Sequence, residues 1–228
     1  MPYEETPPPP PADVLRASYR AFGAVVASVD EEQSWLPTGC TGWAVRDLVL
    51  HCLDDARRGL VVLHTPAGRE PDRDAVTYWE LWRPGTAGGS VDRAVPRVIA
   101  GLFAEFAQLR DLYLETSAAV LHAADRADDG EPVADQEHVL TAGDLVRTLA
   151  VEATVHHLDL TVSLPDAPEP SREGLGEVRR TLDGLLGRPV PLPWDDAHYA
   201  RAATGRAPLT EAERERLGAD AGRFPLFG

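Results

Sequence analysis

Two polar side chains interrupt an apolar stretch in the second half of the chain. Glu152 and His156 are four residues apart, so on a helix both project from one face. Leu145, Leu149 and Leu160 share that face, which marks it as the inward one. Burying a carboxylate and an imidazole is costly unless the groups are paired or hold a metal ion. The spacing therefore predicts either a metal site or a Glu–His hydrogen bond inside the core.

A third polar residue, His51, bears on this choice. It lies beside the apolar Leu48 and Cys52, where a lone histidine is most often a hydrogen-bonded core residue. With Glu152 and His156, however, it completes a set of two imidazoles and one carboxylate. Such a set can hold one divalent cation and leave coordination positions for water or substrate. Zinc, iron, nickel and manganese all accept these donors.

Four long helices must position these residues. Apolar side chains at spacings of three and four residues predict helices over about 13–33, 41–65, 91–125 and 141–164. Thr41 is the expected N-cap of the second helix, and Thr141 with Asp144 resembles a capping box for the fourth. The pattern predicts a mostly α chain built on a four-helix bundle, a fold that places metal sites between facing helices.

The long connection over 66–90 interrupts this regular pattern. It contains an aromatic cluster, Tyr78, Trp79 and Trp82, which we expect to pack as core beneath the loop or to line a pocket. The same connection carries Arg83, which could reach the mouth of the bundle.

Prolines divide the rest of the chain. We expect a flexible Pro-rich N-terminus over 1–11, the bundle over 12–165, and a small C-terminal α(+β) domain over 171–228 that packs on the bundle. Within that domain the predicted elements are a helix over 175–185, a strand-like stretch over 190–192 and two short helices. A capping box, Thr210 with Glu213, begins the last of these.

Composition excludes several classes of protein. The chain has 228 residues and a net charge of −15, which argues against nucleic acid as a partner. No window approaches the 18 apolar residues of a membrane span, and the N-terminus has no secretory pattern. The two cysteines predict reduced thiols in a cytoplasmic protein, which we expect to be a monomer or a homodimer. All 22 basic residues are arginine, so mechanisms that need lysine are excluded.

The sequence resembles the DinB-like metalloproteins and, more closely, the mycothiol-dependent maleylpyruvate isomerase family of actinobacteria. The resemblance rests on Trp43-x3-Asp47-Leu48-x2-His51, on Glu152-x3-His156-His157-x-Asp159, and on the segments 202–210 and 224–228. It implies a DinB-like bundle with a C-terminal domain covering the site. It also implies that His51, Glu152 and His156 bind one divalent ion, zinc first of all, and that mycothiol is the thiol cosubstrate.

The chemistry that the resemblance implies begins with a thiol. A divalent ion depresses the pKa of a coordinated thiol, so that the thiol binds as thiolate near neutral pH. We expect this thiolate to attack a small electrophile, with isomerisation if the thiol is then expelled and thiol transfer if the adduct leaves. A metal-dependent hydrolase of the same superfamily and a non-catalytic ligand-binding module are the alternatives.

Arginines are the candidates for binding a substrate carboxylate through paired hydrogen bonds. Arg206, in the tail that resembles the family, is the first choice, and Arg83 is the second.

Other polar residues near these motifs receive structural roles. Cys40 is predicted to be an incidental loop thiol. His157 and Asp159 are expected either to form a solvent-side pair or to support the neighbouring ligand His156. Asp47 either orients the His51 ring or complements the start of the second helix.

Overall fold

The chain is mostly helical, as its periodicity predicts. The computed structural model describes residues 8–84 and 94–228. The elements in chain order are α1 (Pro11–Ser28), the 3₁₀ turn η1 (Gln33–Trp35), α2 (Val45–Val62), the 3₁₀ helix η2 (Thr77–Trp82), α3 (Ala94–Ala100), α4 (Phe106–Ala124), β1 (Pro132–Asp135), β2 (His138–Thr141), α5 (Ala142–Leu160), η3 (Thr161–Ser163), α6 (Arg172–Leu186), α7 (Asp196–Ala203), α8 (Glu211–Leu217) and η4 (Gly218–Arg223).

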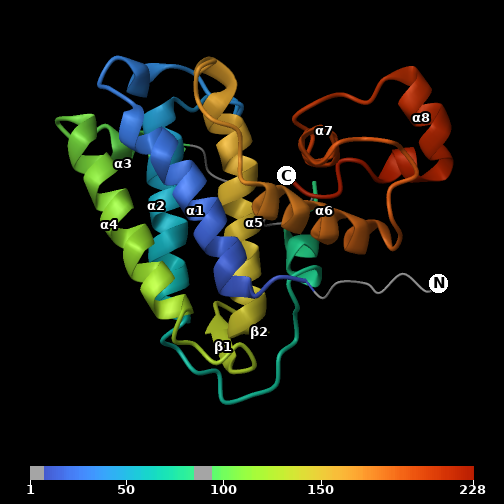
Figure 1. Cartoon of the computed structure of the whole chain (residues 1–228), viewed down its shortest axis with the longest axis horizontal. Helices are drawn as coiled ribbons and strands as arrows, with labels where there is room; N and C mark the ends of the chain where they lie inside the picture. The colour runs from blue at the N-terminus through green and yellow to red at the C-terminus, as the bar shows by residue number, and fades with distance from the viewer. Residues whose placement is uncertain (1–7, 85–93) are drawn as a thin grey trace.

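Four long helices form the bundle. α1 contacts α4 and α5, and α2 contacts the same two helices, so the four close a ring around one interior (Figure 1). Phe22 of α1, Leu48 of α2 and Leu109 of α4 are fully buried inside it. Each such side chain contributes about 1.5–3 kcal/mol when removed from water. The predicted apolar stripes therefore supply the driving force that brings the helices together.

α2 and α5, the helices that carry the predicted ligands, begin with different caps. The Thr141 hydroxyl accepts a hydrogen bond from the Asp144 N–H at 3.0 Å, as predicted for α5. The prediction of Thr41 as the cap of α2 is wrong. Ala44 is the N-cap residue, and its N–H donates to the Asp47 carboxylate at 2.9 Å. Asp47 therefore serves the start of the helix, which is one of its two predicted roles.

The predicted third helix is divided in two. α3 and α4 are separated by residues 101–105, while 91–93 lie outside the described residues. Gly101 weakens helix continuity at the break. The carboxylate of Glu31, distant in sequence, then accepts from the Phe106 N–H at 2.6 Å and satisfies the new helix start. A local pattern carries no information about this contact.

A short β-hairpin precedes α5. β1 pairs antiparallel with β2, with Pro132 opposite Thr141 and Asp135 opposite His138. The turn between them includes Gln136 in the left-handed region, at φ 55°. The strand-like stretch predicted over 190–192 is wrong, because those residues have no strand partner in the described chain.

The C-terminal helices pack on the outer side of α5 (Figure 1). Val155 of α5 joins Val178 and Leu182 of α6 and Tyr199 of α7 in one apolar cluster. α5 therefore has the bundle on one side and the C-terminal helices on the other. Polar side chains on α5 lose contact with water and must find partners within the protein.

Two further expectations concern the ends of the chain. Residues 1–7 of the predicted flexible N-terminus lie outside the described residues, and Pro11 already belongs to α1. The Thr210–Glu213 capping box is confirmed at the start of α8.

None of the helices in the described part of the chain is both long enough and apolar enough to cross a membrane.

Candidate metal centre and its cavity

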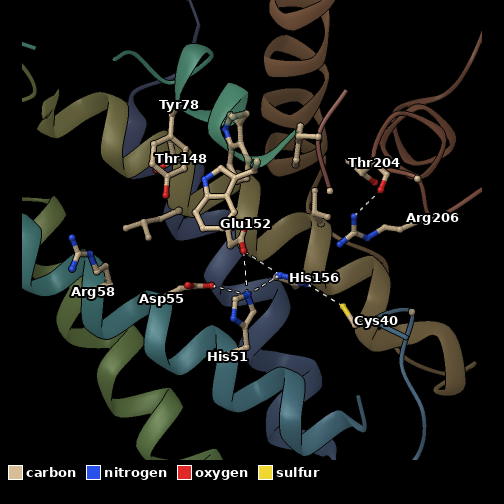
Figure 2. Close-up of a pocket in the computed structure, with 18 of the residues that line it drawn as sticks. Cys40, His51, Asp55, Arg58, Tyr78, Thr148, Glu152, His156, Thr204 and Arg206 are labelled. Carbon is tan, nitrogen blue, oxygen red and sulfur yellow. Dashed lines mark hydrogen bonds and ion pairs between the residues drawn. The ribbon is translucent and has the colours of Figure 1, made fainter. Parts of the chain in front are cut away.

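The three predicted ligands meet where α2 and α5 lie side by side (Figure 2). His51 projects from α2 toward Glu152 and His156 of α5, and two turns further along α2, Gly59 lies against Leu149. The two helices are therefore antiparallel. A Cβ on Gly59 would come within 2.6 Å of Leu149 Cδ1, so the absence of a side chain there permits the close approach.

The three donor atoms form a nearly equilateral triangle. His51 Nε2 is 3.2 Å from Glu152 Oε1 and 3.1 Å from His156 Nε2. His156 Nε2 is 3.1 Å from the same Glu152 oxygen. Ligands that share a tetrahedral cation at about 2.0–2.1 Å lie roughly 3.3 Å from one another. The triangle therefore fits one small divalent cation approached from one side.

The charges of these groups depend on each other. Burial alone would lower the pKa of His156, but the carboxylates of Glu152 and Asp159 outweigh it and raise that pKa well above its usual value. Burial would also lower the pKa of His51, but the carboxylates of Asp55 and Glu152 outweigh burial and raise it. The pKa of Glu152 is lowered by the two histidines against the effect of burial. In the metal-free protein, protons on His51 and His156 thus balance the negative charge of Glu152, which a bound cation would balance in the metal-loaded protein.

Asp159 sets the tautomer of one imidazole. His156 Nδ1 lies 3.0 Å from Asp159 Oδ2, and because an ionised carboxylate only accepts, Nδ1 is the protonated nitrogen. When the ring is neutral, the lone pair of Nε2 therefore faces His51 and Glu152. Histidines that bind metals usually donate their other N–H to a carboxylate or carbonyl in this way.

Of the two alternatives for His157 and Asp159, the solvent-side pair is wrong, whereas the contact of Asp159 with His156 agrees with a supporting role. Each residue is only 1% exposed, because the C-terminal helices cover this side of α5. His157 Nε2 lies 2.8 Å from the main-chain oxygen of Pro168. Asp159 Oδ1 and Oδ2 accept from Nε and NH2 of Arg206, both at 2.8 Å. Although burial opposes it, His156 and Arg206 hold the pKa of Asp159 well below its usual range.

The loop before α2 brings Cys40 to the same point, so its predicted place as an incidental loop thiol is wrong. Cys40 Sγ lies 3.2 Å from Asp159 Oδ2 and 3.7 Å from His156 Nδ1. The neighbouring Gly39 donates its N–H to the main-chain oxygen of Asp159 at 2.9 Å. No sequence spacing signals these contacts, because 119 residues separate Cys40 from Asp159.

Asp55 is an acidic neighbour that the sequence analysis missed. Its Oδ2 lies 3.2 Å from His51 Nε2. Burial raises the pKa of Asp55 to about 6, although the proximity of His51 opposes the increase. Its position four residues after His51, one turn along the inner face of α2, is the signal that could have identified it.

A cavity of about 470 Å³ opens beside the triangle of donor atoms. At one end it is lined by Cys40, Thr204 and Arg206, and at the other by Arg58, Tyr78 and Thr148 (Figure 2). The rings of Trp79 and Phe227, with centroids 4.4 Å apart, close part of its wall. The predicted aromatic cluster is therefore a pocket wall as well as core.

Acidic groups outnumber basic groups around this cavity. The carboxylates belong to Asp55, Asp135, Glu152 and Asp159, and the guanidinium groups to Arg58 and Arg206. With neutral imidazoles this leaves an excess of two negative charges. Uncompensated charge of one sign is costly in a partly buried site. One divalent cation would balance it, so the electrostatics and the donor geometry agree.

The structure places only one of the two predicted arginines at the cavity. Arg206 lines it, and its NH1 also donates to the Thr204 main-chain oxygen at 3.2 Å. Burial would lower the pKa of Arg206, but Asp159 outweighs it and raises that pKa. The side chain of Arg83 is 43% exposed, pairs with Glu80 at 3.3 Å and does not line the cavity.

Comparisons with known proteins agree with this architecture. Residues 15–161 match the family model of the mycothiol maleylpyruvate isomerase N-terminal domain. None of the curated proteins that were compared matches the chain.

Two crystal structures resemble the chain, and both are DinB-like bundles. The first is of the mycothiol-dependent maleylpyruvate isomerase: it is 16% identical, with a TM-score of 0.52, over 75% of this chain and 66% of that one. The chain thus spans just under two thirds of its length. The second, a histidine-to-alanine mutant of such an isomerase, is 15% identical, with a TM-score of 0.60, over 86% of this chain and 88% of that one. At these identities the likeness establishes the fold.

Proposed function

The chain belongs to the mycothiol maleylpyruvate isomerase N-terminal domain family, and we propose that it is a metal-dependent enzyme that uses mycothiol to isomerise a small electrophile or to transfer the thiol to it. The observation that carries the proposal is the convergence of His51, Glu152 and His156 on one side of a partly open cavity. The family membership supports the thiol, and the donor set supports the metal.

His51, Glu152 and His156 would hold the cation, with zinc as the first candidate and iron, nickel or manganese compatible with the same donors. A divalent cation there lowers the pKa of a coordinated thiol, which ionises near neutral pH. The open side of the donor triangle faces the cavity, so a thiol and an electrophile can approach together. Asp159 keeps His156 in the tautomer that directs Nε2 toward this position.

Arg206 is the residue that we propose to bind a carboxylate of the electrophile. Its guanidinium has five N–H donors, of which Asp159 and Thr204 accept from three, so donors remain for a ligand. The Asp159 pair holds the group rigidly beside the donor triangle. We assign this role to Arg206 rather than Arg83 because Arg206 lines the cavity.

We propose that the protein acts in the cytoplasm and that its partners are a small-molecule electrophile and a low-molecular-weight thiol. The cavity volume of about 470 Å³ is compatible with both small molecules at once.

Calorimetric titration with mycothiol tests the proposal. Zinc-loaded protein should bind mycothiol about 100-fold more tightly than metal-free protein, a difference of about 2.7 kcal/mol. The His51→Ala variant should lose this difference, whereas His64→Ala, an exposed histidine of the same region, should retain it. Equal binding with and without zinc would refute the proposal. Conversion of maleylpyruvate that proceeds equally without thiol would refute the thiol mechanism.

A further inference from the structure

The cavity continues past the donor triangle to a second polar end, which the proposed reaction does not use. Arg58 follows His51 by seven residues, about two turns or roughly 10 Å along α2. Thr148 precedes Glu152 by one turn of α5, and because the helices are antiparallel it lies in the same direction. Figure 2 shows Arg58, Thr148 and Tyr78 together, on the side of the triangle away from Arg206.

An ion pair at this end offers both donors and acceptors. Arg58 Nε donates to Asp135 Oδ1 at 2.7 Å, and Arg58 NH2 donates to the same oxygen. Among the described residues, nothing donates to the other oxygen, Oδ2, although Asp135 is only 7% exposed. Because the carboxylate neutralises the guanidinium, this end has no excess positive charge that would attract a second anionic group.

Hydroxyl and aromatic groups complete this end of the cavity. The Thr148 hydroxyl donates to the Leu145 main-chain oxygen at 2.7 Å, so its oxygen can still accept. Burial, and then the charge of Asp135, raise the pKa of Tyr78, so its phenol stays protonated. Trp79 is 4% exposed, lines the cavity, and its indole N–H has no hydrogen-bond partner in the described structure. A ligand that supplies the missing acceptor removes the free-energy cost of leaving such a buried donor without a hydrogen bond.

These features fit a neutral, hydroxyl-rich group. Each hydroxyl both donates and accepts, which matches the ion pair and the hydroxyls, and the apolar faces of a sugar-like ring match the aromatic wall. The cavity is also in the size range of sites that hold ligands larger than a small electrophile. Mycothiol joins its thiol to a group of this chemistry, an amino sugar linked to inositol.

We propose that Arg58, Asp135, Thr148 and Tyr78 form a distal subsite that binds the hydroxyl-rich part of the thiol cosubstrate. This inference rests on the proposed function. In this arrangement the electrophile binds at the end of the cavity lined by Arg206, and the hydroxyl-rich part of the thiol binds at the end lined by Arg58. The thiol sulfur lies between them, at the donor triangle. The distal subsite thereby sets the choice among thiols.

Calorimetric titration of zinc-loaded protein with two thiols tests the subsite. Mycothiol carries the hydroxyl-rich group, and N-acetylcysteine has the same thiol without it. Arg58→Gln should weaken mycothiol binding about tenfold and leave N-acetylcysteine binding unchanged. Tyr78→Phe, which removes one hydroxyl and keeps the ring, should weaken mycothiol alone by about threefold. The control is Arg57→Gln, because Arg57 is half exposed and pairs with Asp54 at 3.3 Å.

The outcomes separate this inference from the proposed function. If wild-type protein binds neither thiol, the proposed function fails and the subsite fails with it. If wild-type protein binds both thiols with equal affinity, the function stands and the subsite is refuted. Unchanged mycothiol affinity in Arg58→Gln and Tyr78→Phe would also refute the subsite. So would an equal loss of affinity for both thiols, if these two variants keep the wild-type melting temperature and zinc content.

Discussion

Asparagine in place of Asp159 should weaken metal binding although none of the three donor atoms is removed. The substitution keeps the shape of the side chain and removes its charge. His156 Nδ1 and Arg206 then compete for one amide oxygen in place of a carboxylate that accepts from both. The imidazole becomes less basic and less firmly oriented, so Nε2 is a poorer ligand.

The magnitude follows from two separate effects. Loss of a carboxylate behind a metal-binding histidine typically costs 10- to 100-fold in metal affinity, or about 1.4–2.7 kcal/mol. Removing one partner of a buried ion pair costs about 3–5 kcal/mol in stability. The Arg206 side chain is 18% exposed, so the lower end applies. For a chain of this size, about 3 kcal/mol lowers the melting temperature by roughly 6–12 °C.

Competition titration with a chelator of known zinc affinity measures the first effect, and thermal unfolding of the metal-free protein measures the second. Asp54→Asn is the matched control, because Asp54 is 52% exposed on the outer side of α2 and should change neither quantity. Zinc affinity within twofold of wild type in a folded Asp159→Asn variant would refute the role assigned to Asp159.

Three further predictions test the ligands, the electrostatics and the packing. His51→Ala and His156→Ala should each lose the one bound zinc ion per chain measured by elemental analysis, and retention by either variant contradicts the ligand assignment. Because both histidine pKa values are raised in the metal-free fold, their protonation stabilises it below about pH 6.5 and this contribution disappears at higher pH. The melting temperature of metal-free protein should therefore fall as the pH rises above about 6.5, while the increase caused by zinc grows, and the opposite slope would refute this assignment of charges. Gly39→Ala should cost about 1–3 kcal/mol in chemical denaturation, because its Cβ would lie 2.4 Å from Asp159 Oδ1, whereas Gly176→Ala in α6 meets no neighbour and should be neutral or stabilising.

Local sequence information was sufficient for the first, second and fourth of the predicted long helices, and for placing Glu152 and His156 on one buried face. The spacing of Glu152 and His156 places them on one face of any helix, and the surrounding leucines identify that face as buried. His51 could be identified because a polar residue inside an apolar stripe is costly without a partner. Each inference uses residues within a few turns of one another, where helical geometry determines which side chains are neighbours.

The surroundings of the triangle were decided by contacts between distant segments. Cys40 and Arg206 reach Asp159 from a loop and from the C-terminal tail, and no periodicity relates these positions. The sequence left Asp159 either facing solvent or supporting His156, because the C-terminal helices that bury it come later in the chain. For the same reason the break before α4 was missed, since the Glu31 carboxylate that satisfies its first N–H is more than seventy residues away.

The amino-acid sequence by itself determined the amphipathic helices and the donors that they carry, because helix periodicity is a local property. Only the tertiary structure decided which carboxylate supports His156, which arginine faces the cavity and where a second polar end forms. These depend on side chains from α2, β1, η2 and the C-terminal tail that meet only after the helices pack, and burial then makes their pairing obligatory.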